Sequence, residues 1–172
     1  MDTCFQDFQI PCRWIPDMGY GYGYPEFNYY PPSVYYLGEL FHLVGFQFID
    51  STKIVFALGL IFSALTMYLF LKDYLSKYSA LVGAVLYTYI PYKAVNVYVR
   101  GALNEFWALV FYPLLFWSSM KIIRDGGKRN IGFFALSVFL ILITHNLMTL
   151  IFIPVLGIWV ILQIILEKKY RS

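Results

Sequence analysis

Long uncharged segments alternate with short charged ones along most of this chain. Between Lys53 and Lys72 lie 18 residues without a charged side chain, close to the roughly 20 that cross a bilayer as a helix. The last uncharged run, 130–166, would be about 55 Å long as one helix, so it must reverse direction, and Thr144–Asn146 is the predicted turning point. The pattern predicts five spans, at 52–72, 78–93, 102–120, 130–144 and 147–166.

A shorter amphipathic pattern precedes the first span. Within 33–49, apolar residues recur at helical spacing, at Val34, Leu37, Leu40, Phe41, Val44 and Phe48. Pro31 and Pro32 stand just before this segment, and Ser33 is the predicted N-cap. We expect an interfacial helix over about 33–49, preceded by an ordered aromatic loop built around "GYGYGYP".

The composition places this chain in a membrane. Hydrophobic residues make up 60% of it, charged residues only 13%, and the mean hydropathy is +0.63, more apolar surface than a soluble domain of this size can bury. The predicted fold class is all-α, a multi-pass transmembrane helical bundle over 51–172 with an extracytoplasmic segment, 1–50. The net charge of +3 is spread over loops, which argues against a nucleic-acid partner.

Charge bias predicts the orientation. Alternate loops collect nine of the thirteen basic residues, so we expect that side to be cytoplasmic, together with the C-terminus. The opposite side receives seven of the ten acids. Since 1–50 contains no apolar leader to carry it outward, we also expect at least one further membrane helix upstream of this sequence. Cys4 and Cys12 could pair if their loop faces an oxidising compartment, but two thiols alone do not decide this.

Three ionisable residues flank the predicted spans on the outer side. Arg100 and Glu105 are five residues apart and would point about 140° apart on an ideal helix. We therefore expect them to address different partners, an anionic ligand for Arg100 and a donor or basic group for Glu105; the alternative is a structural pair that joins two helix ends. Lys93 lies where ionisable groups generally face a cavity. Pro91 and Gly101 are expected to interrupt the helices here.

His145 is the polar point of the last apolar stretch, with Thr144 and Asn146 beside it. Such residues can satisfy the free backbone groups of a helix reversal. His145 could alternatively bind a phosphate or a metal. The sequence contains no spacing typical of a zinc site, a P-loop, a dinucleotide fingerprint or a serine-hydrolase elbow.

Three stretches carry a resemblance to a known family. They are "PCRWIPDMGYGYGYPEFNYYPPSVYYLG", "YVRGALNEFWALVFYPLLFW" and "THNLMTLIF". The chain resembles bacterial multi-pass membrane proteins of the 6-pyruvoyl-tetrahydropterin synthase-related family, which are similar to C-type (GT-C) glycosyltransferases. It lacks the metal-binding histidine pattern of the soluble synthase, so we infer no pterin chemistry.

The resemblance implies sugar transfer from a polyprenyl-phosphate donor at the outer face of the cytoplasmic membrane, to an unknown acceptor. In such enzymes an aspartate early in the first outer loop is the base, a position expected upstream of this sequence. The available carboxylates are Asp17 and Glu105. The predicted substrate-binding residues are Arg13, Trp14, Tyr22, Tyr24, Lys93, Arg100, His145 and Asn146: cationic groups for the departing phosphate and aromatic rings for the sugar and lipid. A divalent metal is a further candidate cofactor.

Two other functions fit the same residues. A transporter or flippase subunit for lipid-linked sugars would line a passage with these charges. The other alternative is a purely structural, non-catalytic membrane subunit or fragment, in which Arg100 and Glu105 would be the structural pair that joins two helix ends.

Overall fold

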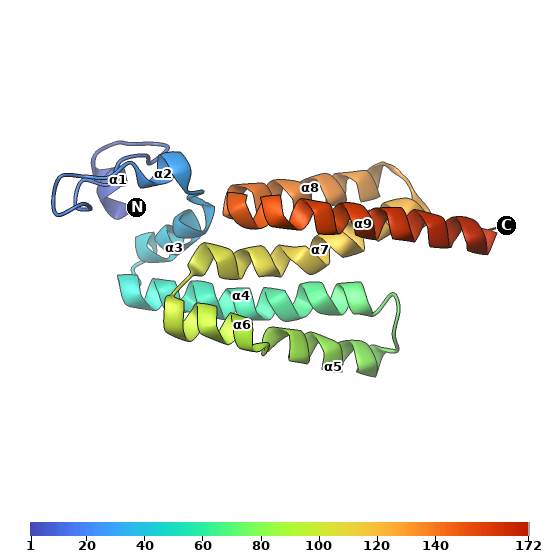
Figure 1. Cartoon of the computed structure of the whole chain (residues 1–172). Coiled ribbons are helices and arrows are strands. Elements are labelled where there is room, and N and C mark those ends of the chain that lie inside the picture. Colours follow the sequence, from blue (N-terminus) through green and yellow to red (C-terminus); the bar gives the residue numbers. More distant parts are fainter. Residues whose placement is uncertain (172) are drawn as a thin grey trace.

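The computed structural model describes residues 1–171, and the side chains of residues 1–167. That part of the chain is helical and contains no strand (Figure 1). The helices are α1 (Asp2–Gln6), α2 (Glu26–Tyr29), α3 (Ser33–Leu43), α4 (Phe48–Leu71), α5 (Lys77–Thr88), α6 (Pro91–Ala94), the π-helix η1 (Val95–Arg100), α7 (Leu103–Asp125), α8 (Lys128–Thr144) and α9 (Asn146–Arg171). The short helices α1 to α3 gather at one end of the long ones, and the C-terminus lies at the other end (Figure 1).

Helix α7 is the centre of the bundle. It packs against α4, α8 and α9, and most of its side chains are buried, among them Phe106 and Leu115. The facing side of α4 carries small or branched buried residues, including Val55, Gly59 and Ser63. A Cβ on Gly59 would lie 2.3 Å from the Phe106 ring, so glycine allows the close approach of the two helices.

Pro113 interrupts the hydrogen bonding of α7, and neighbouring helices compensate. Proline has no N–H to donate to the carbonyl four residues earlier, which belongs to Leu109. The Tyr87 hydroxyl of α5 donates to this carbonyl oxygen at 2.6 Å. Thr66 Oγ1 of α4 donates to the next carbonyl, that of Val110, at 2.8 Å. In an apolar environment such side-chain donors are what makes an interior proline tolerable.

Three helices within the described residues are long and apolar enough to cross a membrane. They are Phe48–Leu71, Leu103–Asp125 and Asn146–Glu167. Helix α5 has 12 residues, about 18 Å of helix, and α8 has 17. The expected count of five spans therefore stays a prediction, although a helix lies in each of the five predicted ranges.

The structure differs from the helix predicted at 33–49. Helix α3 ends at Leu43, and the chain turns through Gly45 at φ +110°, a conformation that side chains other than glycine rarely adopt. Phe48 then begins α4 instead of ending the interfacial helix. Ser33 is the first helical residue and not the N-cap, which is Pro32; the Ser33 hydroxyl donates to the Ile143 carbonyl oxygen at 2.6 Å.

The first 25 residues form a compact loop closed at two places. Ile15 and Tyr24 exchange backbone hydrogen bonds of 2.9 and 3.0 Å, which close the glycine- and tyrosine-rich turn between them. Cys4 and Cys12, whose pairing the sequence leaves open, form a disulfide. The Cys12 amide also donates to the Tyr36 hydroxyl of α3 at 2.8 Å, so this loop is attached to the helix that follows it.

Candidate functional site

An ion pair joins the end of η1 to the start of α7. Arg100 is the last residue of η1, and Glu105 lies in the first turn of α7. Between them Gly101 has φ +60° and ψ +28°, the left-handed conformation that ends helices and turns the chain. Arg100 Nη1 donates to Glu105 Oε1 at 2.8 Å, and Nη2 donates to Oε2 at 2.9 Å. This two-pronged arrangement is the strongest form of an arginine–carboxylate pair.

The expectation that Arg100 and Glu105 do not pair with each other is therefore wrong, while the anionic ligand expected for Arg100 stays a prediction. The ideal-helix angle of about 140° does not apply, because the backbone leaves the helix at Gly101. The alternative expectation, a pair that joins two helix ends, is confirmed.

Two further side chains complete the surroundings of the Glu105 carboxylate. The Tyr92 hydroxyl donates to Oε1, and Asn96 Nδ2 donates to the same oxygen at 3.3 Å. Together with the two bonds from Arg100, the carboxylate accepts four hydrogen bonds. Hydrogen bonds to a carboxylate stabilise it as the anion and so lower its tendency to take a proton. Its geometry suits holding Arg100 better than general-base chemistry.

Arg100 is held but not covered. Its Nη1 also donates to Asn96 Oδ1 at 2.9 Å, the third hydrogen bond of the guanidinium. The Arg100 side chain is 48% exposed. Hydrogen bonding to Glu105 raises the pKa of Arg100 above its ordinary value, so the group stays cationic. The result is an oriented guanidinium with an open edge, which suits an anionic ligand such as phosphate.

Tyr30 and His145 lie beside this ion pair. Their rings meet edge to face, with centroids 5.5 Å apart. Burial raises the pKa of Tyr30 to about 12, and the charge of Glu105 contributes to the shift while Arg100 opposes it, so its hydroxyl remains a donor at neutral pH. Burial lowers the pKa of His145, which the Glu105 charge partly opposes. His145 is therefore neutral at pH 7.

His145 caps α9. Its Nδ1 accepts a hydrogen bond from the Met148 amide at 3.2 Å, the bond that an N-cap side chain makes to the third residue of a helix. Thr149 Oγ1 donates to the carbonyl oxygens of Ile141 and His145, at 3.1 and 2.7 Å. These contacts fit the expectation that polar side chains at the helix reversal satisfy its free backbone groups. The phosphate or metal role of His145 stays a prediction.

Three side-chain bonds attach residues 29–33 to the bundle beside this site. Asn146 Nδ2 donates to the Tyr29 carbonyl oxygen at 3.2 Å, Asn104 Nδ2 donates to that of Pro31 at 2.6 Å, and Ser33 donates to Ile143 as described above. Asn146, predicted as a substrate-binding residue, thus has its amide nitrogen on the backbone that positions Tyr30.

Lys93 lies apart from the ion pair. Its side chain is 0% exposed, and its Nζ donates to Ser63 Oγ of α4. The ammonium also lies 3.4 Å from the centre of the Tyr87 ring, close enough for a cation–π interaction. No carboxylate within the described residues pairs with it.

The predicted residues of the N-terminal loop are not joined to this site. No hydrogen bond, ion pair or ring contact in the described part of the chain links Arg13, Trp14, Asp17, Tyr22 or Tyr24 to the Glu105 surroundings. All five are exposed. The Trp14 ring instead covers Gly23, where a Cβ would lie 2.3 Å from it.

Sequence reasoning missed Tyr30, Tyr92 and Asn96. Tyr92, Asn96 and Arg100 follow one another at intervals of four residues, so a search for polar side chains on one helix face could have found the first two. Tyr30 has no such signal, because its contact with His145 joins residues 115 positions apart.

Metal binding stays an untested expectation. Among residues 1–167, no group of three or more His, Cys, Asp or Glu side chains is close enough to hold a metal ion. Glu105, the carboxylate at the centre of the site, already accepts four hydrogen bonds. As arranged, these residues do not fit a divalent ion.

Apolar helices long enough for a bilayer, with a charged centre at one end, define the class as a helical membrane protein. The family described as 6-pyruvoyl-tetrahydropterin synthase related domain, a family of membrane proteins, matches residues 27–172. The chain belongs to this family. No curated protein and no solved structure matches this chain.

Proposed function

We propose that this protein is an integral membrane enzyme of the glycosyltransferase type. It would transfer a sugar from a polyprenyl-phosphate donor at the outer face of the cytoplasmic membrane. The observation that carries the proposal is the Arg100 guanidinium, which is half exposed while Glu105 and Asn96 fix its orientation.

The chemistry of such a transfer requires a cation at the phosphate. The acceptor oxygen forms a bond to the anomeric carbon of the sugar, the bond from that carbon to the phosphate oxygen breaks, and the phosphate keeps the electron pair. A guanidinium of fixed orientation binds this developing charge. Tyr30, protonated at neutral pH, adds a neutral donor nearby.

A groove between α4 and η1, the helix that ends at Arg100, suits a lipid chain. It has a volume of about 530 Å³ and runs between α4 and η1, lined by Ile49, Thr52, Lys53, Phe56, Ala57, Leu60, Val97 and Tyr98. Val97 and Tyr98 precede Arg100 on η1 by three and two residues. A polyprenyl chain in this apolar groove would bring its phosphate toward the guanidinium.

The proton of the acceptor needs a separate carboxylate. Glu105 is a positioning residue in this proposal, because its oxygens are occupied by Arg100, Tyr92 and Asn96. Asp17 is the available candidate base, since its exposed side chain has no hydrogen-bond or ion-pair partner among the described residues. The exposed rings of Trp14, Tyr22 and Tyr24 could then cover the sugar.

The disulfide supports an outer location for the N-terminal segment. Cys4 and Cys12 are paired, and disulfides persist in exported compartments while the cytosol keeps thiols reduced. This agrees with the charge bias along the sequence.

The proposal is tested in proteoliposomes that contain the purified protein and a radiolabelled polyprenyl-phosphate sugar. The readout is the label recovered in a product that is no longer attached to the donor lipid. Arg100→Ala should abolish product formation and leave membrane insertion intact. Arg129→Ala, which removes the same side chain from an exposed position of α8, should not. Equal product with both variants would refute the role of Arg100.

Lys93 favours a second candidate function, transport of lipid-linked sugars. A buried lysine bonded to Ser63 and lacking a carboxylate partner in the described residues is unusual inside a membrane, where such groups often mark a passage. Transport would be favoured if the intact lipid-linked sugar crosses the proteoliposome membrane without forming product, and if Lys93→Met abolishes this movement.

A further inference from the structure

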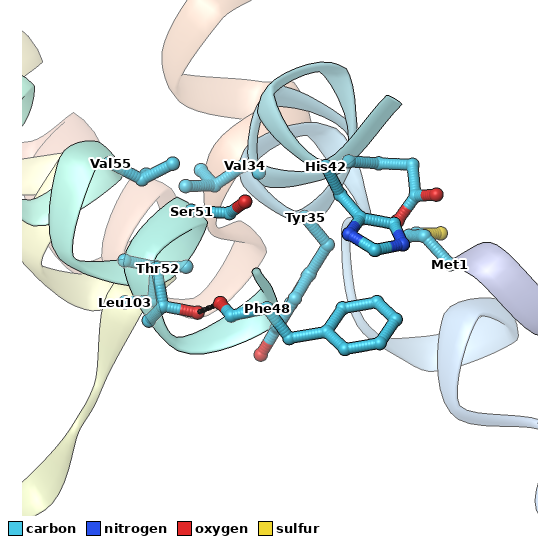
Figure 2. A pocket seen from close by; sticks show the side chains of 11 residues that line it. Met1, Val34, Tyr35, His42, Phe48, Ser51, Thr52, Val55 and Leu103 are labelled. Carbon is cyan, nitrogen blue, oxygen red and sulfur yellow. Dashed lines mark hydrogen bonds between the residues drawn. The ribbon is translucent and has the colours of Figure 1, made fainter. Parts of the chain in front are cut away.

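A pocket of about 150 Å³ lies between α3 and α4, with Leu103 of α7 also in its lining; neither Arg100 nor Glu105 lines it. Figure 2 shows Val34, Tyr35 and His42 of α3 on one side of it and Phe48, Ser51 and Thr52 of α4 on the other, with Met1 at its edge. Gly38 and Glu39 also line it. The pocket is a hollow between two packed helices rather than part of the sugar site proposed above.

Two buried polar side chains in this pocket have an atom without a partner. Glu39 is 5% exposed and Ser51 is 3% exposed. Neither Glu39 Oε1 nor Ser51 Oγ makes a hydrogen bond to any described residue. Buried polar atoms are almost always bonded, because an unpaired one loses its hydration without compensation. Both oxygens are thus available to accept hydrogen bonds from a group in the pocket.

The lining of the pocket favours a positively charged ligand. A carboxylate and hydroxyls line it, no lysine or arginine does, and Met1 with its α-amino group lies at its edge. Tyr35, His42 and Phe48 contribute rings, and His42 stacks on Phe48 with centroids 3.9 Å apart. His42 Nδ1 bonds to the Phe46 carbonyl oxygen at 2.9 Å. A carboxylate among aromatic rings suits an organic cation.

The number and type of oxygens narrow the cation further. Calcium requires six to eight oxygen ligands, more than one carboxylate and its neighbouring hydroxyls supply. A quaternary ammonium has no N–H and cannot bond to Glu39 Oε1 or Ser51 Oγ. A primary ammonium has three N–H donors, enough for both oxygens.

We propose that the pocket between α3 and α4 binds a primary ammonium group, with Glu39 as its counter-charge and Ser51 as a second acceptor. The group could come from a free amine such as ethanolamine or from the headgroup of an ethanolamine lipid. The proposal does not depend on sugar transfer, because no side-chain hydrogen bond or ion pair among the described residues joins the pocket lining to Arg100 or Glu105.

The test uses the purified protein in detergent, with the melting temperature followed against concentration of ethanolammonium chloride. Choline chloride at equal ionic strength is the reference. A ligand that binds the folded state raises the melting temperature, and the dependence gives an apparent Kd. Nanodiscs of ethanolamine lipid and of choline lipid then distinguish a lipid headgroup from a free amine.

Three variants separate the pocket from general charge effects. Glu39→Gln should weaken ethanolammonium binding by about tenfold or more, the usual effect of losing a charged hydrogen bond. Gly38→Ala adds a methyl group to the lining at ordinary contact distance, 3.8 Å from Val55, and should weaken binding without unfolding α3. Asp50→Asn removes a half-exposed acid in the first turn of α4 and should leave binding unchanged.

The proposal is supported if ethanolammonium or ethanolamine lipid stabilises the protein, if Glu39→Gln and Gly38→Ala reduce this stabilisation, and if Asp50→Asn retains it. Equal responses to ethanolammonium and choline in both formats overturn it, as does unchanged binding in Glu39→Gln and Gly38→Ala. In either of these cases the pocket holds only water. If Glu39→Gln does not fold, Gly38→Ala alone decides between these results.

Discussion

Glu105 and Glu39 are two buried carboxylates in opposite situations. Glu105 accepts four hydrogen bonds, two of them from a guanidinium. Glu39, on the adjacent helix α3, has an oxygen with no partner among the described residues. The two side chains are similarly buried, so burial does not distinguish their roles. The number of hydrogen bonds that each carboxylate accepts does. The satisfied carboxylate shapes the protein, whereas the unsatisfied one marks a place for a ligand.

The largest expected effect is that of Glu105→Gln on stability. The glutamine amide cannot form the charged two-pronged bond to Arg100. Its NH2 group replaces one carboxylate oxygen and cannot accept a hydrogen bond from the neighbouring donors. We expect the free energy of unfolding to fall by about 2 kcal/mol, measured by denaturation in mixed micelles with tryptophan fluorescence. A loss below about 0.5 kcal/mol would mean that the four bonds of Glu105 contribute no more than an exposed contact.

Gly101→Ala should have the next largest effect. Nothing lies within 4 Å of a Cβ at this position, so the cost comes only from the left-handed backbone, about 1 kcal/mol for alanine. Gly132→Ala, in α8 and equally uncrowded, should be neutral or stabilising, because alanine favours a helix. Equal stability of the two variants would show that the turn joining Arg100 to Glu105 is not constrained.

A smaller effect should appear with pH. The pKa of His145 is lower in the folded protein than its ordinary value, so the unfolded chain binds more protons below about pH 6.5. The contribution of His145 is complete above that pH and is lost as the pH falls through the folded pKa. Histidine NMR titration should give a still lower pKa in Glu105→Gln, because the nearby negative charge is gone, and no change in Glu39→Gln. An unchanged pKa in Glu105→Gln would separate His145 from the site.

The smallest effect is expected for Glu39→Gln in the absence of an amine. This change removes the negative charge of a carboxylate whose Oε1 has no hydrogen-bond partner, so no hydrogen bond of that oxygen is lost. Stability should stay within about 0.5 kcal/mol or increase, since burying an unpaired charge is unfavourable. A loss as large as that of Glu105→Gln would indicate a partner for Glu39 and remove the contrast between the two residues.

The sequence predicts the helices better than the site. Uncharged runs identify the long helices. The predicted interruptions are also present: α6 starts at Pro91, η1 ends before Gly101, and α8 ends before His145. Local patterns also suggest that α3 starts after two prolines. They do not predict its end at Leu43, because the pattern continues across Gly45 onto residues that belong to α4.

The site could be predicted only where its contacts are local. Arg100 and Glu105 are recognisable as candidates, but their pairing depends on the backbone conformation of Gly101, which no helical periodicity contains. Lys93 is equally noticeable in the sequence, yet its side chain contacts Ser63 and Tyr87 and not the ion pair. The contact of Tyr30 with His145 exists only after the chain has folded.

The central claim, that Arg100 held by Glu105 binds the phosphate of a lipid carrier, is tested most directly by binding. The measurement is the Kd for a short-chain polyprenyl phosphate, by microscale thermophoresis of the purified protein and its variants. We predict about tenfold or more weaker binding in Arg100→Ala, a similar loss in Glu105→Gln because the guanidinium is no longer oriented, and no change in Arg129→Ala. Equal affinity of all four proteins would contradict the claim.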